Sequence, residues 1–340
     1  MGFLYFLESI RNPIMDFLMS TITYAGGEIV FLAVAIILIW CVNKRHGFFT
    51  LLTCFFGIAI NQVLKLAFRI PRPWIKDPDF TIVESAREEA TGYSFPSGHT
   101  QNVTGTFASI ALTNPKRARV ISCSVIIALV AFSRMYLGVH TPLDVGVSLV
   151  IGVALAFALH PLFSSEERMK KAMPYALTVS ALISVAFVLF TFLLPSEGLD
   201  PHNLESGRKN ACTMIGCVVG LILFYIVDTR YIKYTTEAPW YAQIMKVGIG
   251  FAIVLLMKST LQTPLEWVFG GNAYIARAVR YFLLVVFAGC IWTLTFRFWS
   301  NLKIKALDRF GENVCACLRR IFAKKNAGTS VEIDSDMQTN

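Results

Sequence analysis

The amino-acid sequence predicts an all-α polytopic membrane protein, a bundle of membrane-spanning helices. Its composition is the first reason. Hydrophobic residues make up 55% of the 340, charged residues only 16%, and the mean hydropathy is +0.57, whereas a soluble globular domain carries about 25% charged residues. Two further observations agree: apolar runs long enough to cross a bilayer recur along the chain, and the basic residues cluster between them.

The expected elements follow the apolar runs in order. Residues 1–24 have apolar side chains at helical spacing, interrupted by Glu8, Arg11 and Asp16, a pattern typical of a helix lying in the membrane interface. Nine spans are then expected. They lie near residues 29–42, 49–68, 98–113, 119–138, 143–163, 175–194, 211–228, 242–261 and 276–298.

The connections between these spans alternate in charge. Basic residues gather at 44–45, 116–119, 168–171, 230–233 and 303–325, while the intervening connections are longer or more acidic. Because basic connections stay on the cytoplasmic side, the N-terminus is predicted outside and the C-terminus in the cytoplasm. The net charge of +9 is therefore a topology signal, and no nucleic-acid partner is expected.

Three polar stretches fall on the same predicted outer side, at residues 65–74, 94–100 and 133–144. In the third, Thr141, Pro142 and Asp144 form the start of a helix. Asp144 either only caps this helix or accepts a hydrogen bond from one ring nitrogen of His140, leaving the other nitrogen basic. The pattern alone favours neither role.

The second stretch, Pro96 to His99, also precedes an apolar helix. The backbone N–H groups of Ser97, Gly98 and His99 are expected to be free, with the positive end of the helix dipole behind them, which favours an anion. The Ser97 hydroxyl either caps the helix or donates to an oxyanion.

The first stretch and Arg134 add three cations. Lys65 lies in an apolar run and is expected to snorkel outward or meet an anion. Arg72, between Pro71 and Pro73, is expected in an extended segment just outside its span. Anchoring at the interface also explains either residue taken singly. Arg134 lies on the outer side, against the charge trend.

Together these residues suit phosphoryl transfer. Cations and backbone N–H groups would neutralise the phosphoryl oxygens, one imidazole would attack phosphorus, and the other would protonate the leaving group. The outer stretches hold no close carboxylate cluster for Mg²⁺, so a metal-independent reaction with no cofactor is expected.

The three stretches resemble the signature of the type 2 phosphatidic acid phosphatase superfamily. That signature stands here as Lys65, six residues, Arg72-Pro73; Pro96-Ser97-Gly98-His99; and Ser133-Arg134, five residues, His140, three residues, Asp144. The resemblance implies that His140 is a nucleophile forming a phosphohistidine, Asp144 its partner and His99 the general acid. It implies phosphate contacts from Lys65, Arg72, Ser97, Gly98 and Arg134.

The resemblance covers residues 1–165, a six-helix phosphatase core made of the interfacial start and five spans. Residues 166–300 are expected to add transmembrane helices, and residues 301–340 a basic amphipathic helix and a disordered cytoplasmic tail. In the added part, Arg277 and Arg280 either extend the headgroup site or anchor at the interface. Gly216 and Gly220 are expected to mark close helix packing.

The expected activity is hydrolysis of a lipid phosphate or diphosphate monoester at the outer face of a bacterial plasma membrane. Undecaprenyl diphosphate, phosphatidylglycerophosphate and phosphatidic acid are the candidate substrates, and the sequence does not choose among them. A sugar-phosphate phosphatase, a lipid phosphotransferase and a non-enzymatic lipid binder or transporter are the alternatives. The expected partners are the lipid substrate and the bilayer; the oligomeric state stays open.

Overall fold

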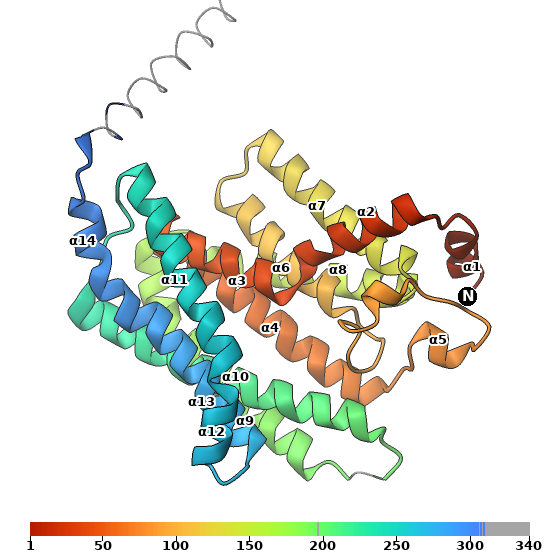
Figure 1. Ribbon diagram of the computed structural model, residues 1–340. Coiled ribbons are helices and arrows are strands. Elements are labelled where there is room, and N and C mark those ends of the chain that lie inside the picture. The colour runs from red at the N-terminus through yellow and green to blue at the C-terminus, as the bar shows by residue number, and fades with distance from the viewer. Residues whose placement is uncertain (196, 306, 308, 310–340) are drawn as a thin grey trace, which may run out of the picture.

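The computed structural model describes residues 1–195, 197–305, 307 and 309, and every regular element in these residues is helical (Figure 1). The helices of the first half are α1 (Gly2–Ser9), α2 (Pro13–Thr23), α3 (Glu28–Ile37), α4 (Lys44–Phe68), α5 (Pro73–Lys76), α6 (Gly98–Thr113), α7 (Arg117–Tyr136) and α8 (Pro142–Leu159). Those of the second half are α9 (Glu166–Leu193), α10 (Pro201–Val227), α11 (Trp240–Thr260), α12 (Gln262–Val268), α13 (Ala273–Val286) and α14 (Phe296–Asn301). The all-α prediction is confirmed.

Within the described residues, length and composition identify seven helices that can cross a membrane. The number is eight if the bent pair of residues 13–26 and 28–42, which turns by 48°, counts as one span. The predicted nine spans are not reached, because residues 98–113 form α6, which has only 16 residues. A physical reason is visible in its environment. Thr100, Thr104 and Ser109 of α6 are fully buried, so this helix faces protein rather than lipid and does not need a long apolar surface.

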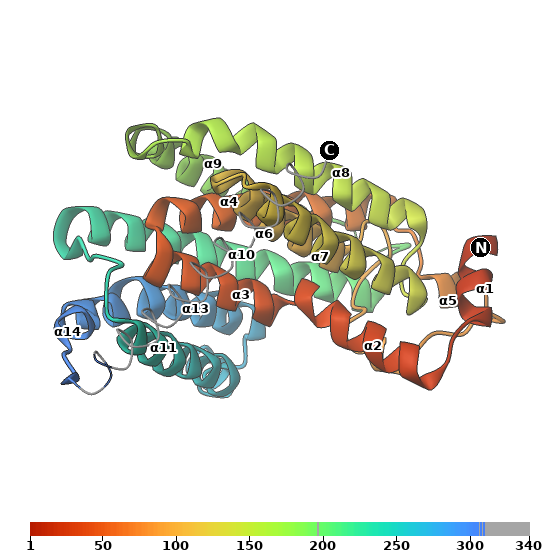
Figure 2. The same ribbon diagram turned by 90° about the horizontal axis from the view of Figure 1, so that it is seen from above.

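The short helix α6 is the centre of the first half and packs against α4, α7 and α8. Small residues allow this close approach. A Cβ at Gly105 would lie 3.0 Å from Cys54 Sγ, and a Cβ at Gly152 would lie 2.6 Å from a Thr104 methyl. Figure 2 shows the long helices lying roughly along one axis, with α1 and α5 at one end of the bundle and α14 at the other.

The N-terminal segment forms two helices rather than the single interfacial helix that was predicted. Asn12 caps the second helix through a bond from Met15 N to its Oδ1 (3.0 Å), and Pro13 occupies its first position. Both are helix-start signals, which explains the break. The helix α2 lies against α7, where the Tyr136 hydroxyl donates to Asp16 (2.8 Å). Apolar side chains such as Phe6 and Phe17 remain exposed.

The close packing expected at Gly216 and Gly220 is confirmed between α10 and α13. A Cβ at Gly216 would lie 2.1 Å from the Ala278 carbonyl oxygen, and one at Gly220 would lie 2.8 Å from Val285. These contacts are possible only for glycine, so the two backbones approach closely. The helix α9 packs against both α4 and α10 and joins the two halves of the chain.

The division of the chain at residue 165 and near residue 300 stays a prediction. The expected amphipathic helix and tail of residues 301–340 lie almost wholly outside the described residues, which end at 305, 307 and 309.

Candidate active site

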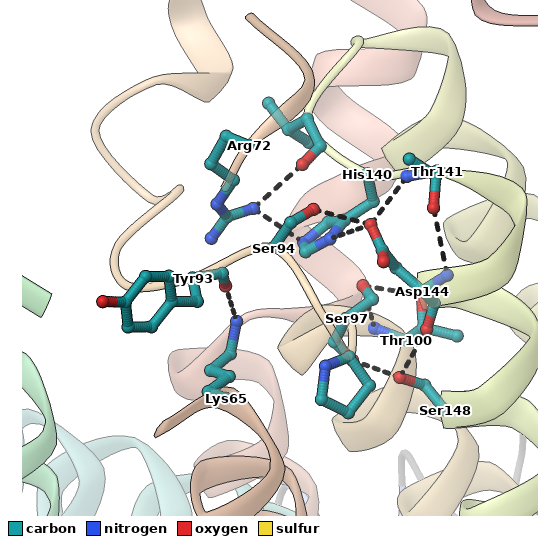
Figure 3. A network of polar contacts seen from close by, with 12 residues as sticks. Lys65, Arg72, Tyr93, Ser94, Ser97, Thr100, His140, Thr141, Asp144 and Ser148 are labelled. Atoms are coloured by element: carbon teal, nitrogen blue, oxygen red, sulfur yellow. Dashed lines mark hydrogen bonds and ion pairs between the residues drawn. The ribbon is translucent and has the colours of Figure 1, made fainter. Parts of the chain in front are cut away.

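The start of α8 holds the carboxylate that faces the site. Thr141 is its N-cap, Pro142 its first residue, and Thr141 and Asp144 form a reciprocal capping box. One oxygen of Asp144, Oδ2, accepts bonds from the Thr141 N–H (2.8 Å) and the Ser94 hydroxyl (2.6 Å), and it lies 3.5 Å from Nδ1 of His140 (Figure 3). The two roles left open for Asp144 are therefore compatible, because the same oxygen caps the helix and faces the imidazole.

His140 is buried between this carboxylate and Arg72. Arg72 Nη1 lies 2.9 Å from Nε2 of His140 (Figure 3). Since a guanidinium can only donate, Nε2 accepts, and the ring proton of the neutral imidazole resides on Nδ1, toward Asp144. Burial first, and then the positive charges of Arg72, Arg134 and Lys65, hold the pKa of His140 well below its ordinary value. The imidazole is therefore neutral at pH 7, as a nucleophile requires.

Arg72 is fixed by the loop that follows it. Its backbone is extended (φ −64°, ψ 153°), as predicted. Its guanidinium donates to the carbonyl oxygens of Thr91 (2.8 Å), Gly92 (3.1 Å) and Val139 (2.9 Å). The helix before it ends at Phe68, ahead of Pro71, because Arg69 takes a left-handed conformation (φ 51°).

Lys65 and Arg134 are buried cations that the helices carry to the same place. Lys65 does not snorkel outward; it is 7% exposed and donates to the Tyr93 carbonyl oxygen (Figure 3). Arg134 is fully buried, and its Nη1 donates to the Thr23 hydroxyl (2.8 Å). Its Nε and Nη2 are buried without a partner in the described part of the chain. Two nitrogen atoms of one buried guanidinium thus keep N–H donors that favour binding of an anion.

The start of α6 brings a second histidine. Ser97 is the N-cap and its hydroxyl accepts from Thr100 N (3.4 Å), so the hydroxyl caps the helix as an acceptor and keeps its own proton for a further hydrogen bond. The expectation that its backbone N–H is free is wrong, because this group donates to the Asp144 carbonyl oxygen (3.2 Å). The second histidine, His99, lies 2.8 Å from Glu89 through Nε2 and Oε2. The bond from His99 holds the pKa of Glu89 below its usual range.

These elements enclose a pocket of about 560 Å³. Its polar lining includes six of the eight residues predicted at the site: Lys65, Arg72, Gly98, His99, Arg134 and His140. The other two, Ser97 and Asp144, are buried behind this lining. Within the described residues, the structure therefore brings all three sequence motifs to one pocket.

Arg277 and Arg280 of α13 are not brought to this pocket. The Nε of Arg277 donates to the Thr213 hydroxyl (2.8 Å), and Nη1 of Arg280 donates to the Lys258 carbonyl oxygen (3.0 Å). Arg277 lines a second cavity instead. Of the residues described, neither arginine lines the pocket around His140.

Sequence reasoning assigned no role to Glu89, Ser94 or Asn61. Ser94 holds Asp144, and Asn61 Nδ2 donates to the Pro96 carbonyl oxygen (3.2 Å), which fixes the loop before α6. The signal for Asn61 was present, because it lies one helical turn before Lys65 in an apolar run. No sequence spacing would have linked Glu89 to His99, because both lie on an irregular loop or at its end.

Comparisons with known proteins identify a family for most of the chain. The sequence profile described as PAP2 superfamily matches residues 46–168, and the profile described as PAP2 superfamily phosphatase, transmembrane extension, matches residues 212–302. No solved structure matches the chain significantly.

Several curated proteins are similar in sequence. Undecaprenyl-diphosphatase BcrC of Bacillus subtilis is 33% identical over 156 residues, which cover 44% of this chain and 75% of that protein. Phosphatidylglycerophosphatase B of Bacillus subtilis is 31% identical over 163 residues, which cover 44% of this chain and 75% of that protein. Lipid phosphate phosphatase delta of Arabidopsis thaliana is 21% identical over 276 residues, which cover 77% of this chain and 65% of that protein.

The unpaired donors of Arg134 lead to a prediction about anion binding. Orthovanadate, a tetrahedral phosphate mimic, is expected to bind the purified protein and raise its Tm. Replacing Arg134→Gln is expected to raise the vanadate Kd at least about tenfold, because a hydrogen bond to a charged group contributes about 1.5–3 kcal/mol. Titration calorimetry measures the Kd.

The exposed arginine Arg87, paired with Glu84, provides the matched control. Arg87→Gln removes the same charge and is expected to leave the vanadate Kd within about twofold, since exposed pairs contribute little. Equal Kd values for the two variants would contradict the role of Arg134. If Arg134→Gln fails to fold, Arg134→Lys replaces it. This variant keeps the positive charge but loses the paired N–H donors of the guanidinium, and its vanadate Kd is compared with that of Arg87→Gln.

Proposed function

The chain belongs to the PAP2 superfamily and is a membrane-embedded lipid phosphate phosphatase, and we propose that it works through a phosphohistidine on His140, without a metal, at the outer face of the membrane. The observation that carries this proposal is the position of His140. Its Nε2 lies 2.9 Å from Arg72, its Nδ1 faces Asp144, and its pocket holds three cations.

The first step transfers the phosphoryl group to the protein. The substrate's phosphate takes over the Arg72 hydrogen bond that now occupies Nε2, which frees the lone pair to attack phosphorus. The P–N bond forms as the P–O bond to the lipid breaks. The leaving oxygen takes a proton from His99, and Asp144 stabilises the positive charge on the His140 ring.

The second step releases phosphate. Water attacks phosphorus while His99 takes one of its protons, and the P–N bond breaks. Inorganic phosphate leaves and His140 returns to its neutral form. In both steps Lys65, Arg72 and Arg134 stabilise the negative oxygens of the transferring group, the largest source of rate acceleration in such reactions.

One observation supports a reaction without a metal. The positive charge that the transition state needs is supplied by three cations that line one pocket.

The substrate class follows from the relatives and the site. The relatives named above act, by their names, on undecaprenyl diphosphate, phosphatidylglycerophosphate and lipid phosphates. We propose the shared chemistry of these substrates, a phosphate or diphosphate monoester of a long-chain lipid. Both leaving groups, an alkoxide and a lipid phosphate, can be released by the same two steps.

The proposed orientation rests on charge at the far end of the bundle. There Lys44 pairs with Asp228 (2.7 Å) and Arg45 donates to the Ser164 carbonyl oxygen, so three of the basic connections meet. If the membrane sorts these connections by charge, this end faces the cytoplasm and the pocket faces outward. Counting the bent pair and α6 as spans then restores nine crossings.

The activity is tested by phosphate release from purified protein in EDTA. The substrates are phosphatidic acid, phosphatidylglycerophosphate, undecaprenyl diphosphate and glucose 6-phosphate. Release from the lipids is expected to survive EDTA, and His140→Ala is expected to lower kcat by about 10⁴-fold or more, as for other nucleophiles. His202→Ala, an exposed histidine outside the pocket, serves as control and should retain activity.

Each outcome has a meaning. Loss of activity in EDTA would contradict the metal-free reaction, and full activity of His140→Ala would contradict the nucleophile. Release from glucose 6-phosphate alone would indicate a sugar-phosphate phosphatase. Phosphate appearing on an added lipid or sugar alcohol, with none released, would indicate a phosphotransferase.

The orientation is tested by reporter fusions in a bacterial host. Alkaline phosphatase, which folds actively only outside the plasma membrane, is inserted in the 194–200 connection or in the 163–166 connection. The first fusion is expected to be active and the second inactive. The reverse pattern would place the pocket in the cytoplasm and overturn the proposed face.

A further inference from the structure

A second cavity of about 380 Å³ lies between the two halves of the protein. Its walls come from α3, α4 and α6 of the first half and from α10, α11 and α13 of the second. Most of its lining is apolar, including Phe31, Ala35, Phe55, Met214, Val218 and Leu284. The reaction described above uses none of these six apolar residues, so it does not explain the cavity.

This cavity adjoins the catalytic pocket. Six residues line both spaces: Glu28, Gln62, Gly98, Asn102, Asn210 and Lys258. Gly98 is the residue before His99, and no atom lies within 4 Å of the position where its Cβ would be. A side chain at this position would project into open space, so glycine leaves the path from the cavity to His99 clear.

Amide side chains mark the junction between the two spaces. Asn210 Nδ2 donates to Gln62 Oε1 (3.0 Å), which ties α10 to α4. Nearby lining residues carry unused polar atoms: Oδ1 of Asn61 and both polar atoms of Gln101 are buried without a partner in the described residues. Such groups are costly unless a ligand or water satisfies them. The lining is therefore cationic in the catalytic pocket, carries amide groups at the junction, and is apolar in the second cavity.

An ion pair holds the two halves together along this path. Lys258 of α11 lies 3.1 Å from Glu28 of α3, and the Tyr281 hydroxyl of α13 donates to the same carboxylate (3.2 Å). The second half therefore closes the side of the path that the first half leaves open. Without α10, α11 and α13, the apolar cavity would lose one wall.

We propose that this cavity binds the hydrocarbon chain of the substrate while its phosphate lies against His140. This inference rests on the proposed function and deepens it. A molecule that fills both spaces must be charged at one end and apolar at the other, which describes a long-chain phosphate ester. The amides at the junction then contact the polar linkage between phosphate and chain.

The proposal assigns a role to the second half of the chain. Residues 166–300 supply Met214, Val218 and Leu284 as chain contacts, and so they select substrates by the chain rather than by the phosphate. A chain that stayed in the surrounding bilayer would make no use of this wall.

The first arm of the test compares two neighbouring residues of α10. Val218 lines the cavity and is 1% exposed, whereas Val219 points outward and is 45% exposed. Phosphate release is measured from hexadecyl phosphate and butyl phosphate, with the protein in lipid nanodiscs. In Val218→Phe, the ratio of kcat/KM for the long chain over the short chain is expected to fall at least tenfold. In Val219→Phe, this ratio is expected to stay within twofold of the unmodified protein.

The second arm uses the unmodified protein, so it does not depend on a variant folding. Hexadecyl phosphate with a diazirine near the chain end is photolysed in nanodiscs, and cross-linked peptides are identified by mass spectrometry. Cross-links are expected on 211–224 and 281–289, at the cavity face. Excess hexadecyl phosphate should compete for them, and phosphate-free hexadecanol should not.

The two hypotheses can fail separately. Two outcomes would overturn chain binding in the cavity and leave the proposed phosphatase activity standing. The first is that Val218→Phe hydrolyses both esters with an unchanged ratio of kcat/KM values, and the second is that cross-links are confined to lipid-facing residues. Cross-links that hexadecanol displaces equally well would show a resident structural lipid only, which also overturns the proposal. Cross-links at the cavity without hydrolysis of either ester would instead contradict the proposed function.

Discussion

Three buried cations line one pocket together with the His140 imidazole. The rest of the site partly compensates their positive charge. A charged side chain within a spanning helix, such as Lys65 or Arg134, costs about 3 kcal/mol even on lenient scales, and Arg72 lines the same pocket. The loop of residues 69–97 supplies carbonyl oxygens to Lys65 and Arg72. Among the described residues, the Arg134 guanidinium donates to an uncharged group, the Thr23 hydroxyl. A bound phosphate group would neutralise the positive charge that these groups leave uncompensated.

This charge also sets the state of the histidine. The same cations that would bind phosphate hold the pKa of His140 well below its ordinary value, after burial itself. An imidazole kept neutral by its surroundings can attack, and a bound phosphate would then favour the imidazolium that phosphorylation creates. The Asp144 carboxylate, fixed by Ser94 and by its cap position, lies on the side where that charge develops. Binding and activation of the nucleophile therefore depend on one arrangement.

Much of this could be predicted from the sequence where the information is local. The capping box at Thr141 and the extended backbone at Arg72 follow from Pro and Thr positions, and the shared face of three motifs follows from alternating charge. The burial of Lys65 could not be predicted, because its partner is a carbonyl oxygen 28 residues away. The predicted run of residues 98–113 coincides with α6, whose 16 residues are too few for it to be identified as a span by length; its neighbours rather than lipid decide this length. The lining residues shared by the two cavities come from helices of both halves, so no local sequence pattern predicts that the cavities adjoin.

The central claim is that His140 carries the phosphoryl group, and trapping that intermediate tests it most directly. Protein mixed briefly with ³²P-labelled lipid phosphate and quenched in alkali, where phosphohistidine survives, should retain label on the peptide that contains residues 133–144. The label should be lost on acid treatment and absent from His140→Ala. Label on a peptide without His140, or label that His140→Ala retains, would contradict the account.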